Sequence, residues 1–212
     1  MKRNLICTLT LSAMFAVSAL ALPGCASLLD PGTPPAVYTI SPAMPDKNSG
    51  PKLNKQMAIV QPSANDMLAT NRIITRYANG EVRAWKNVSW TSTGPAMIQR
   101  MLVQAFEADG RLVGMPYDAV GFNADCRMIS DLRAFNVVLD ENDRPSYVQV
   151  SLAVHLVDLR GGKSLGARAS DCRAKVQGAG LAPVLVAFEQ ATGQCIQEVS
   201  AWAIQVLQSS EK

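Results

Sequence analysis

Cysteine and histidine side chains supply much of the nucleophilic and metal-binding chemistry of proteins, and this chain of 212 residues has five cysteines and one histidine. The single histidine, His155, lies among apolar residues, and no sequence motif pairs it with an activated nucleophile. We therefore interpret it as a histidine on a sheet face, satisfied by a hydrogen bond. One histidine and no C-x-x-C pair also disfavour a metal site. The sequence predicts no catalytic residue, no metal and no cofactor, and hence no enzyme.

Two polar clusters have the composition of ligand sites but the context of turns. Asp140, Glu141 and Asp143 lack the central glycine and the distal glutamate of a calcium loop, and they stand between two predicted strands. Gly161-Gly162-Lys163 also connects two strands, whereas a phosphate-binding loop would precede a helix. Both clusters are predicted to be solvated turns.

Cys25 ends a segment that has the order of an export signal. The basic start, Met1-Lys2-Arg3, is followed by an apolar run from Leu5 to Leu22 that contains no charge. The ending Leu22-Pro23-Gly24-Cys25 resembles the lipobox of bacterial lipoproteins, in which the cysteine is lipidated and the preceding peptide is removed. The alternatives are an uncleaved helical anchor and an ordinary signal peptide. We predict a signal peptide over residues 1–24 and lipidation of Cys25.

The mature chain would have 188 residues and little net charge. Residues 1–24 contain two basic residues and no acidic one, so their removal lowers the net charge from +3 to +1. This disfavours nucleic acid as a partner, because a nucleic-acid binder needs a clustered basic face. Three acyl chains, the usual lipoprotein load, would hold the protein stably on a membrane. Ala26 follows the cysteine, and by the sorting rule of enterobacterial lipoproteins this favours the periplasmic face of the outer membrane.

The mature chain divides into a tether and one folded domain. Residues 25–55 are rich in Pro, Ser, Gly, Asn and Lys and cannot bury much apolar surface, which predicts a lipidated flexible tether. One apolar island within it, Val37 to Ile40, is a candidate edge strand. The folded domain is predicted to span residues 56–208, a length that suffices for one hydrophobic core.

Periodicity along the domain predicts strands, a helix, strands and a helix. Predicted strands are Met57–Pro62, Arg72–Tyr77, Val82–Trp90, Ala124–Leu139, Tyr147–Leu159 and Ser164–Val176, with an Asn79-Gly80 hairpin turn and a bulge near Arg133. One helix is expected between Thr93 and Gly110, and Pro183 is expected to open the other. The order predicts an α+β fold in which two main helices pack on one face of an antiparallel sheet.

Three cysteines remain in the folded domain, and an oxidising compartment favours one disulfide among them. If the last three strands form a meander, Cys126 and Cys172 lie roughly 25 Å apart at about 3.3 Å per residue, which is too far for a bond. The last helix would bring Cys195 back to the level of Cys172 on its buried stripe. We predict a Cys172–Cys195 disulfide, and the sequence assigns Cys126 no role.

An ordered set of residues resembles one protein family. Trp90, Pro95, Gln99 and the run Ala105-Phe106-Glu107 occur in the order typical of ABC-type transport auxiliary lipoproteins. The segments Val37–Ile40, Asn71–Ile73 and Leu132–Phe135 and the closing helix with Trp202 also fit that pattern. The similarity covers nearly all of the mature chain.

The resemblance implies a role in envelope transport. Such lipoproteins work with an inner-membrane ATPase, a permease and an MCE-domain protein that moves lipids or other apolar molecules. This chain would contact the MCE protein at the outer membrane and would have no ATPase activity, since it has no P-loop sequence. A lipoprotein regulator of a cell-wall enzyme and an enzyme with an unrecognised site are the competing hypotheses, and homo-oligomerisation stays open.

One surface is predicted to bind the partner. The Tyr147–Leu159 strand is apolar on both faces, and one face packs on the helices. The other face, with Ala153, Val157 and Leu159, must be covered by a partner or by the Val37–Ile40 strand. Val157 and Leu159 are the candidate partner-binding residues.

Overall fold

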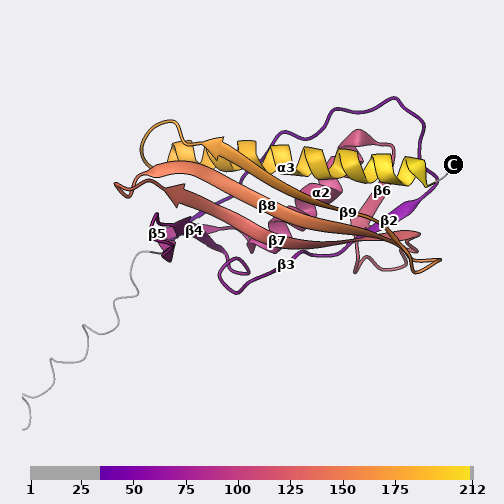
Figure 1. Ribbon diagram of the computed structural model, residues 1–212, viewed down its shortest axis with the longest axis horizontal. Helices are drawn as coiled ribbons and strands as arrows, with labels where there is room; N and C mark the ends of the chain where they lie inside the picture. The colour runs from indigo at the N-terminus through magenta and orange to yellow at the C-terminus, as the bar shows by residue number, and fades with distance from the viewer. Residues whose placement is uncertain (1–33, 211–212) are drawn as a thin grey trace, which may run out of the picture. The chain divides into compact units, whose positions relative to one another are not determined.

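A long antiparallel hairpin of β7 (Cys126–Leu139) and β8 (Pro145–Asp158) forms the centre of the sheet (Figure 1). β9 (Ser164–Lys175) adds to the free edge of β8, also antiparallel. The pairing of β7 with β8 shifts at Arg133, so the predicted bulge is confirmed. The computed structural model describes residues 34–210 of the chain, and Pro35 is the first residue of the unit that contains all of these elements.

Short strands line the other edge of β7 from end to end. β2 (Gln56–Ile59), β3 (Ser63–Ala64) and β4 (Arg72–Arg76) each run parallel to β7, beside its start, its middle and its end respectively. The remaining strands are β1 (Ala36–Tyr38), β5 (Val82–Trp90) and β6 (Val113–Pro116), of which β1 pairs with β5, β5 with β4, and β6 with β2. The predicted hairpin at Asn79-Gly80 joins β4 to β5, and Gly80 has the positive φ of 87° that its turn requires.

The prediction of an α+β fold with an antiparallel sheet is confirmed, and short strands that pair parallel to their neighbours extend the sheet. A strand of 14 residues spans about 46 Å, which leaves room for several short partners along one edge. The chain crosses from β5 to β7 through α2 and β6, and a crossover of this length allows the earlier strands to run parallel to β7. The residue pattern within a short strand does not specify whether that strand pairs parallel or antiparallel with its neighbour.

Two helices, α2 (Gly94–Asp109) and α3 (Leu181–Ser209), lie against one face of the sheet and contact each other (Figure 1). α2 begins after Thr93 and ends at Gly110, which adopts the left-handed conformation with φ of 77°. α3 begins at Leu181, two residues before the expected Pro183.

The core fills the space between the sheet and the helices. The inward residues of β8 are fully buried: Val148, Val150, Leu152, Val154 and Leu156. Trp90 of β5, Phe135 of β7 and Phe188 of α3 meet at ring-centroid distances of 5.0 to 5.8 Å. Aromatic pairs at such distances attract each other in addition to the gain from burying their surface. This trio therefore joins β5 and α3 to the central strand β7.

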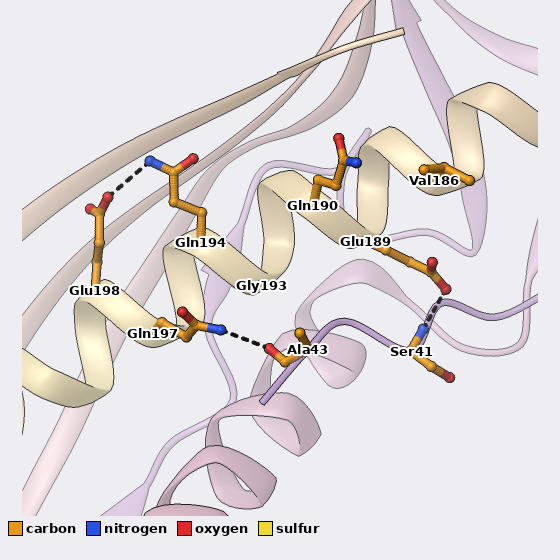
Figure 2. A pocket seen from close by; sticks show the side chains of 9 residues that line it. All are labelled: Ser41, Ala43, Val186, Glu189, Gln190, Gly193, Gln194, Gln197 and Glu198. Atoms are coloured by element: carbon orange, nitrogen blue, oxygen red, sulfur yellow. Dashed lines mark hydrogen bonds between the residues drawn. The ribbon is translucent and has the colours of Figure 1, made fainter. Parts of the chain in front are cut away.

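The segment 39–55, hereafter the strap, packs on the helices. The prediction of a flexible tether over residues 25–55 is therefore wrong for residues 39–55. The strap runs along α3 and α2, and its Ile40 and Leu53 side chains are only 4% and 8% exposed. Ser41 donates its backbone N–H to Glu189 at 3.0 Å, and Gln197 donates to the carbonyl of Ala43 at 3.1 Å (Figure 2). Side chains of α3 therefore replace water as partners of the strap backbone.

The strap also bonds to the end of α2. The backbone N–H groups of Asn48 and Leu53 donate to the carbonyls of Asp109 and Arg111 at 3.0 and 2.8 Å.

We expect the double substitution Glu189→Ala and Gln197→Ala to release the strap. Each lost hydrogen bond contributes about 1 kcal/mol net, so the loss of both should make local opening about thirtyfold more frequent. Limited trypsin digestion measures this as faster cleavage after Lys47 and Lys52, both exposed on the strap. Gln194→Ala is the matched control, since that side chain bonds Glu198 and not the strap. Equal cleavage of all three proteins would show that these two contacts do not hold the strap.

Candidate functional site

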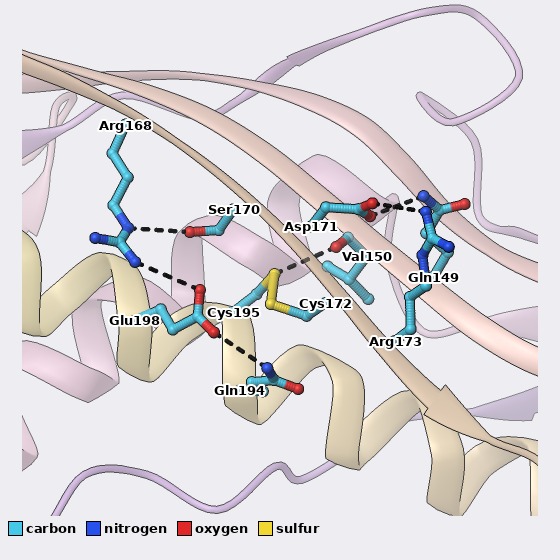
Figure 3. Close-up of a disulfide and its surroundings, with 10 residues drawn as sticks. All are labelled: Gln149, Val150, Arg168, Ser170, Asp171, Cys172, Arg173, Gln194, Cys195 and Glu198. Carbon is cyan, nitrogen blue, oxygen red and sulfur yellow. Dashed lines mark hydrogen bonds and ion pairs between the residues drawn. A yellow bond between two sulfur atoms is a disulfide. The ribbon is translucent and has the colours of Figure 1, made fainter.

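The disulfide lies between the sheet and α3. Cys172 of β9 is bonded to Cys195 of α3 with their Cα atoms 5.7 Å apart, and both residues are buried (Figure 3). The register accounts for the pairing, because β8 places Cys126 opposite Asp158 but Cys172 opposite Val150, eight residues away along the strand. The disulfide joins the last strand to the last helix and closes a chain segment with a sequence separation of 23.

Cys126 is a free, buried cysteine at the start of β7. Its thiol donates to the carbonyl of Gln56 at 3.6 Å. Burial raises the pKa of the Cys126 thiol to about 11. The thiolate is the reactive form of cysteine, so this side chain is a poor nucleophile at neutral pH and acts as a small core residue.

The polar clusters singled out by sequence lie in turns. Asp140 accepts hydrogen bonds from the backbone N–H groups of Asn142 and Arg144 at 2.9 Å, and the bond from Arg144 contributes most to lowering the pKa of the Asp140 carboxyl. Asp143 has a positive φ of 58°, which suits a turn. Within residues 34–210 no cluster of His, Cys, Asp and Glu side chains is placed to hold a metal ion.

His155 is exposed on the outer face of β8, the face turned away from the helices. Its neighbours across the ladders are Ile129 of β7 and Ala167 of β9, neither of which has a side chain that a base could activate.

The two predicted binding residues lie at the end of β8, Val157 within the strand and Leu159 in the turn that follows it. Ile129 and Leu159 are 43% and 38% exposed, and Val157 is half-buried between Arg127 and Ser164 of the neighbouring strands. We call Ile129, Val157 and Leu159 the outer patch. Ala153, expected on the same face, is only 6% exposed and is thus covered within this chain.

The Val37–Ile40 segment does not cover the outer patch. Its strand, β1, pairs with β5, whose other neighbour is β4, so β7 separates it from β8. Ile40 lies instead beside Met97 and Met101 of α2. The outer patch is therefore open within residues 34–210. A cation–π contact borders it, with the Arg127 guanidinium 4.5 Å from the Tyr117 ring.

The lipidation residue, Cys25, and the predicted signal peptide lie outside the described residues. Among residues 34–210, neither α2 nor α3 combines the length and the apolar content that a membrane span requires. The strap contacts were not anticipated from sequence. A possible signal for the strap was the isolated apolar pair Ile40 and Leu53 at either end of a polar stretch.

Residues 38–200 match the family model described as the ABC-type transport auxiliary lipoprotein component. This chain belongs to that family. The match extends from the end of β1 to the middle of α3 and thus includes the strap, the sheet and the disulfide. Membership makes the chain a lipoprotein of a transport system and agrees with the resemblance identified from sequence.

Two crystal structures share the fold of this family member. A protein from Xanthomonas campestris superposes with a TM-score of 0.73 at 21% identity, covering 83% of this chain and 99% of that chain. A second, uncharacterized protein gives a TM-score of 0.63 at 16% identity, covering 81% of this chain and 99% of that one. At these identities the likeness shows the fold alone.

A curated relative is longer than this chain. An uncharacterized protein of Bradyrhizobium diazoefficiens is 26% identical over 162 residues, which make up 74% of this chain but 42% of that protein. The chain thus matches less than half of that relative's length.

Proposed function

We propose that this lipoprotein is a non-enzymatic accessory subunit of an ABC/MCE-type envelope transport system for lipids or other apolar molecules. It docks the periplasmic MCE-domain protein, and through it the inner-membrane permease and ATPase, at the periplasmic face of the outer membrane. The observation that carries the proposal is the family match over residues 38–200. The lipobox at Cys25 and the following Ala26 support the anchor and the choice of membrane.

The outer patch is the proposed contact with the MCE protein. Ile129 and Leu159 are exposed beside the half-buried Val157, and an apolar centre is typical of interfaces. Val157 is that centre, between Ile129 and Leu159. A docking role also agrees with the surroundings of His155, because neither of its cross-strand neighbours, Ile129 and Ala167, is a nucleophile.

Substitution of Val157 by aspartate should weaken binding of the MCE protein about tenfold. A carboxylate at the centre of an apolar contact must lose its hydration without gaining a partner, and a loss of 1.4 kcal/mol is already tenfold in affinity. Co-purification of the lipoprotein with the tagged MCE protein, followed by titration of the purified pair, measures the change. Circular dichroism checks that the variant is folded.

Val186→Asp is the matched control, because Val186 is an equally apolar residue that is 52% exposed on α3, in the helix layer. It should bind like the wild type. Unchanged binding by Val157→Asp would remove the outer patch from the proposal. His155→Gln should leave transport nearly unchanged, and a folded, partner-bound His155→Gln protein without activity would revive the enzyme hypothesis.

A further inference from the structure

A hollow of about 320 Å³ lies over β7 on the outer face of the sheet, toward the opposite end of β8 from the outer patch. Buried residues of β4, β7 and the loop before β4 form its floor, and two arginines and a glutamine also line it. We call it the Arg76 hollow and define it by Leu68, Ile74, Arg76, Ala134, Asn136 and Gln149.

An amide without a good partner is buried in the floor of the hollow. Asn136 is only 8% exposed, and its register partners Ile74 and Gln149 place it on the outer face. Within residues 34–210 its side chain makes one hydrogen bond, a long one of 3.5 Å from Nδ2 to the carbonyl of Val137, the next residue. A buried amide that lacks a good partner destabilises a fold. The floor around Asn136 is aliphatic, so packing alone would favour an apolar residue at this position.

The Arg76 guanidinium reaches across β7 beside this amide. Arg76 belongs to β4 and Gln149 to β8, and β7 lies between these two strands. The guanidinium donates to Oε1 of Gln149 at 3.5 Å, and Gln149 in turn donates to Asp171 at 2.7 Å (Figure 3). Asn136 is the residue of β7 opposite Gln149, so one cation and one amide meet over the floor of the hollow.

Arg76 is the unneutralised cation of the hollow. The second arginine that lines it, Arg133, pairs with Asp131 at 3.1 Å. The Asp171 carboxylate on the same face pairs with Arg173 at 2.8 Å. Among the described residues no carboxylate forms an ion pair with Arg76. One positive charge therefore remains without a counter-charge beside the buried amide.

The rest of the lining is aliphatic and partly exposed. Met67 and Val82 are 44% and 42% exposed, beside the buried Leu68 and Ile74. A short hydrocarbon chain in the hollow would remove apolar surface of both exposed residues from water. The volume is at the lower end of the range of about 300 to 1,000 Å³ for small-molecule sites, so it suits a head group and a few carbon atoms.

We propose that the Arg76 hollow binds a small amphiphile with a singly charged anionic head, held by Arg76 and Asn136, and a short aliphatic chain that lies on Leu68 and Ile74. A guanidinium donates two parallel hydrogen bonds to such an oxyanion, and the amide can donate a third. A single unneutralised cation favours a single negative charge. A free aliphatic carboxylate and the phosphodiester head of a lipid share this chemistry. The site lies apart from the outer patch, and its test does not depend on the proposed function.

Sodium hexanoate is the probe for this site. We expect it to bind the lipidated full-length protein, purified in a neutral detergent, at least tenfold more tightly than either hexanol or sodium acetate. Hexanol lacks the charge and acetate lacks the chain, so each removes one part of the recognition. Isothermal titration calorimetry measures the three affinities. If hexanoate binds no more tightly than hexanol or no more tightly than acetate, the inference is wrong.

Arg76→Gln should weaken hexanoate binding at least tenfold, because it removes the unneutralised charge from an exposed side chain. Arg72→Gln is the matched control, since it removes the same charge from an exposed position of the same strand that does not line the hollow. The control should bind hexanoate like the wild type. An equal loss in both variants would show unspecific attraction to a basic surface and overturn the inference.

Asn136→Val separates a ligand-binding amide from a structural one. It should weaken hexanoate binding several-fold and leave the midpoint of thermal unfolding unchanged or raised, because the amide loses no good partner within the chain. A lowered midpoint together with unchanged hexanoate binding would make Asn136 a structural residue and overturn the inference.

A soluble short-chain phospholipid distinguishes the two sources of the anionic head. If dihexanoylphosphatidylglycerol binds more tightly than hexanoate and Arg76→Gln weakens both, the head is a lipid phosphodiester. If it binds more weakly than hexanoate, the head is a free carboxylate. Either result supports the inference, whereas binding of the phospholipid that Arg76→Gln does not weaken would contradict it.

Discussion

Replacing Cys25 by serine is expected to abolish lipidation and to release the protein from the membrane. The motivation is the ending Leu22-Pro23-Gly24-Cys25 after a charge-free apolar run. A thioether to lipid requires the cysteine sulfur, so serine cannot accept the anchor. Each buried methylene of an acyl chain contributes about 0.8 kcal/mol, and two or more lipid chains hold a protein stably. Loss of all of them should move nearly the whole population to the soluble fraction.

Metabolic labelling with a fatty-acid analogue measures the lipid, and membrane fractionation measures the location. The wild type should be labelled and should sediment with the outer membrane. Cys126→Ser is the control, because that substitution also removes one thiol but leaves the lipobox unchanged. Equal labelling of Cys25→Ser and the wild type would mean that Cys25 is not the lipidated residue.

Removal of the disulfide by Cys172→Ala with Cys195→Ala is expected to lower the free energy of unfolding by about 3 kcal/mol. Loop-closure entropy for a sequence separation of 23 predicts this magnitude. The destabilisation corresponds to more than a hundredfold in the unfolding equilibrium. The loss should be concentrated between β9 and α3, since the disulfide joins those two elements (Figure 3).

Urea unfolding with and without reductant measures the contribution. The wild type should lose stability when the reductant is added, whereas the double variant should not respond. Mass spectrometry of a non-reduced digest should identify linked Cys172 and Cys195 peptides. A linked peptide that contains Cys126 would contradict the register of β7, β8 and β9.

Sequence reasoning predicted the elements whose signals are local. The apolar stripe between Thr93 and Gly110, the Asn79-Gly80 turn and the alternation along β8 each reflect contacts within a few residues. The bulge at Arg133 was visible because the alternation of buried residues changes phase there. The meander register followed from these local features, and it places Cys172 beside Cys195.

The strap was missed because its contacts are long-range and involve its backbone. Its composition is that of a linker, and composition records what side chains a segment can bury. The bonds that hold it are donated and accepted by main-chain groups and join it to Glu189 and Gln197, well over a hundred residues away. A local sequence pattern cannot predict a hydrogen bond between a main-chain group and a side chain that is more than a hundred residues away in the sequence.

By itself, the sequence determined the family resemblance, the order of the main elements and the pairs that short turns bring together. Tertiary structure alone decided the parallel partners of β7, the packing of the strap on the helices, and which surfaces stay exposed within residues 34–210. The physical reason is that a strand pattern specifies which side chains face the core but not which backbone lies beside it. The outer patch is exposed because β1, the strand that could have covered it, pairs with β5 instead.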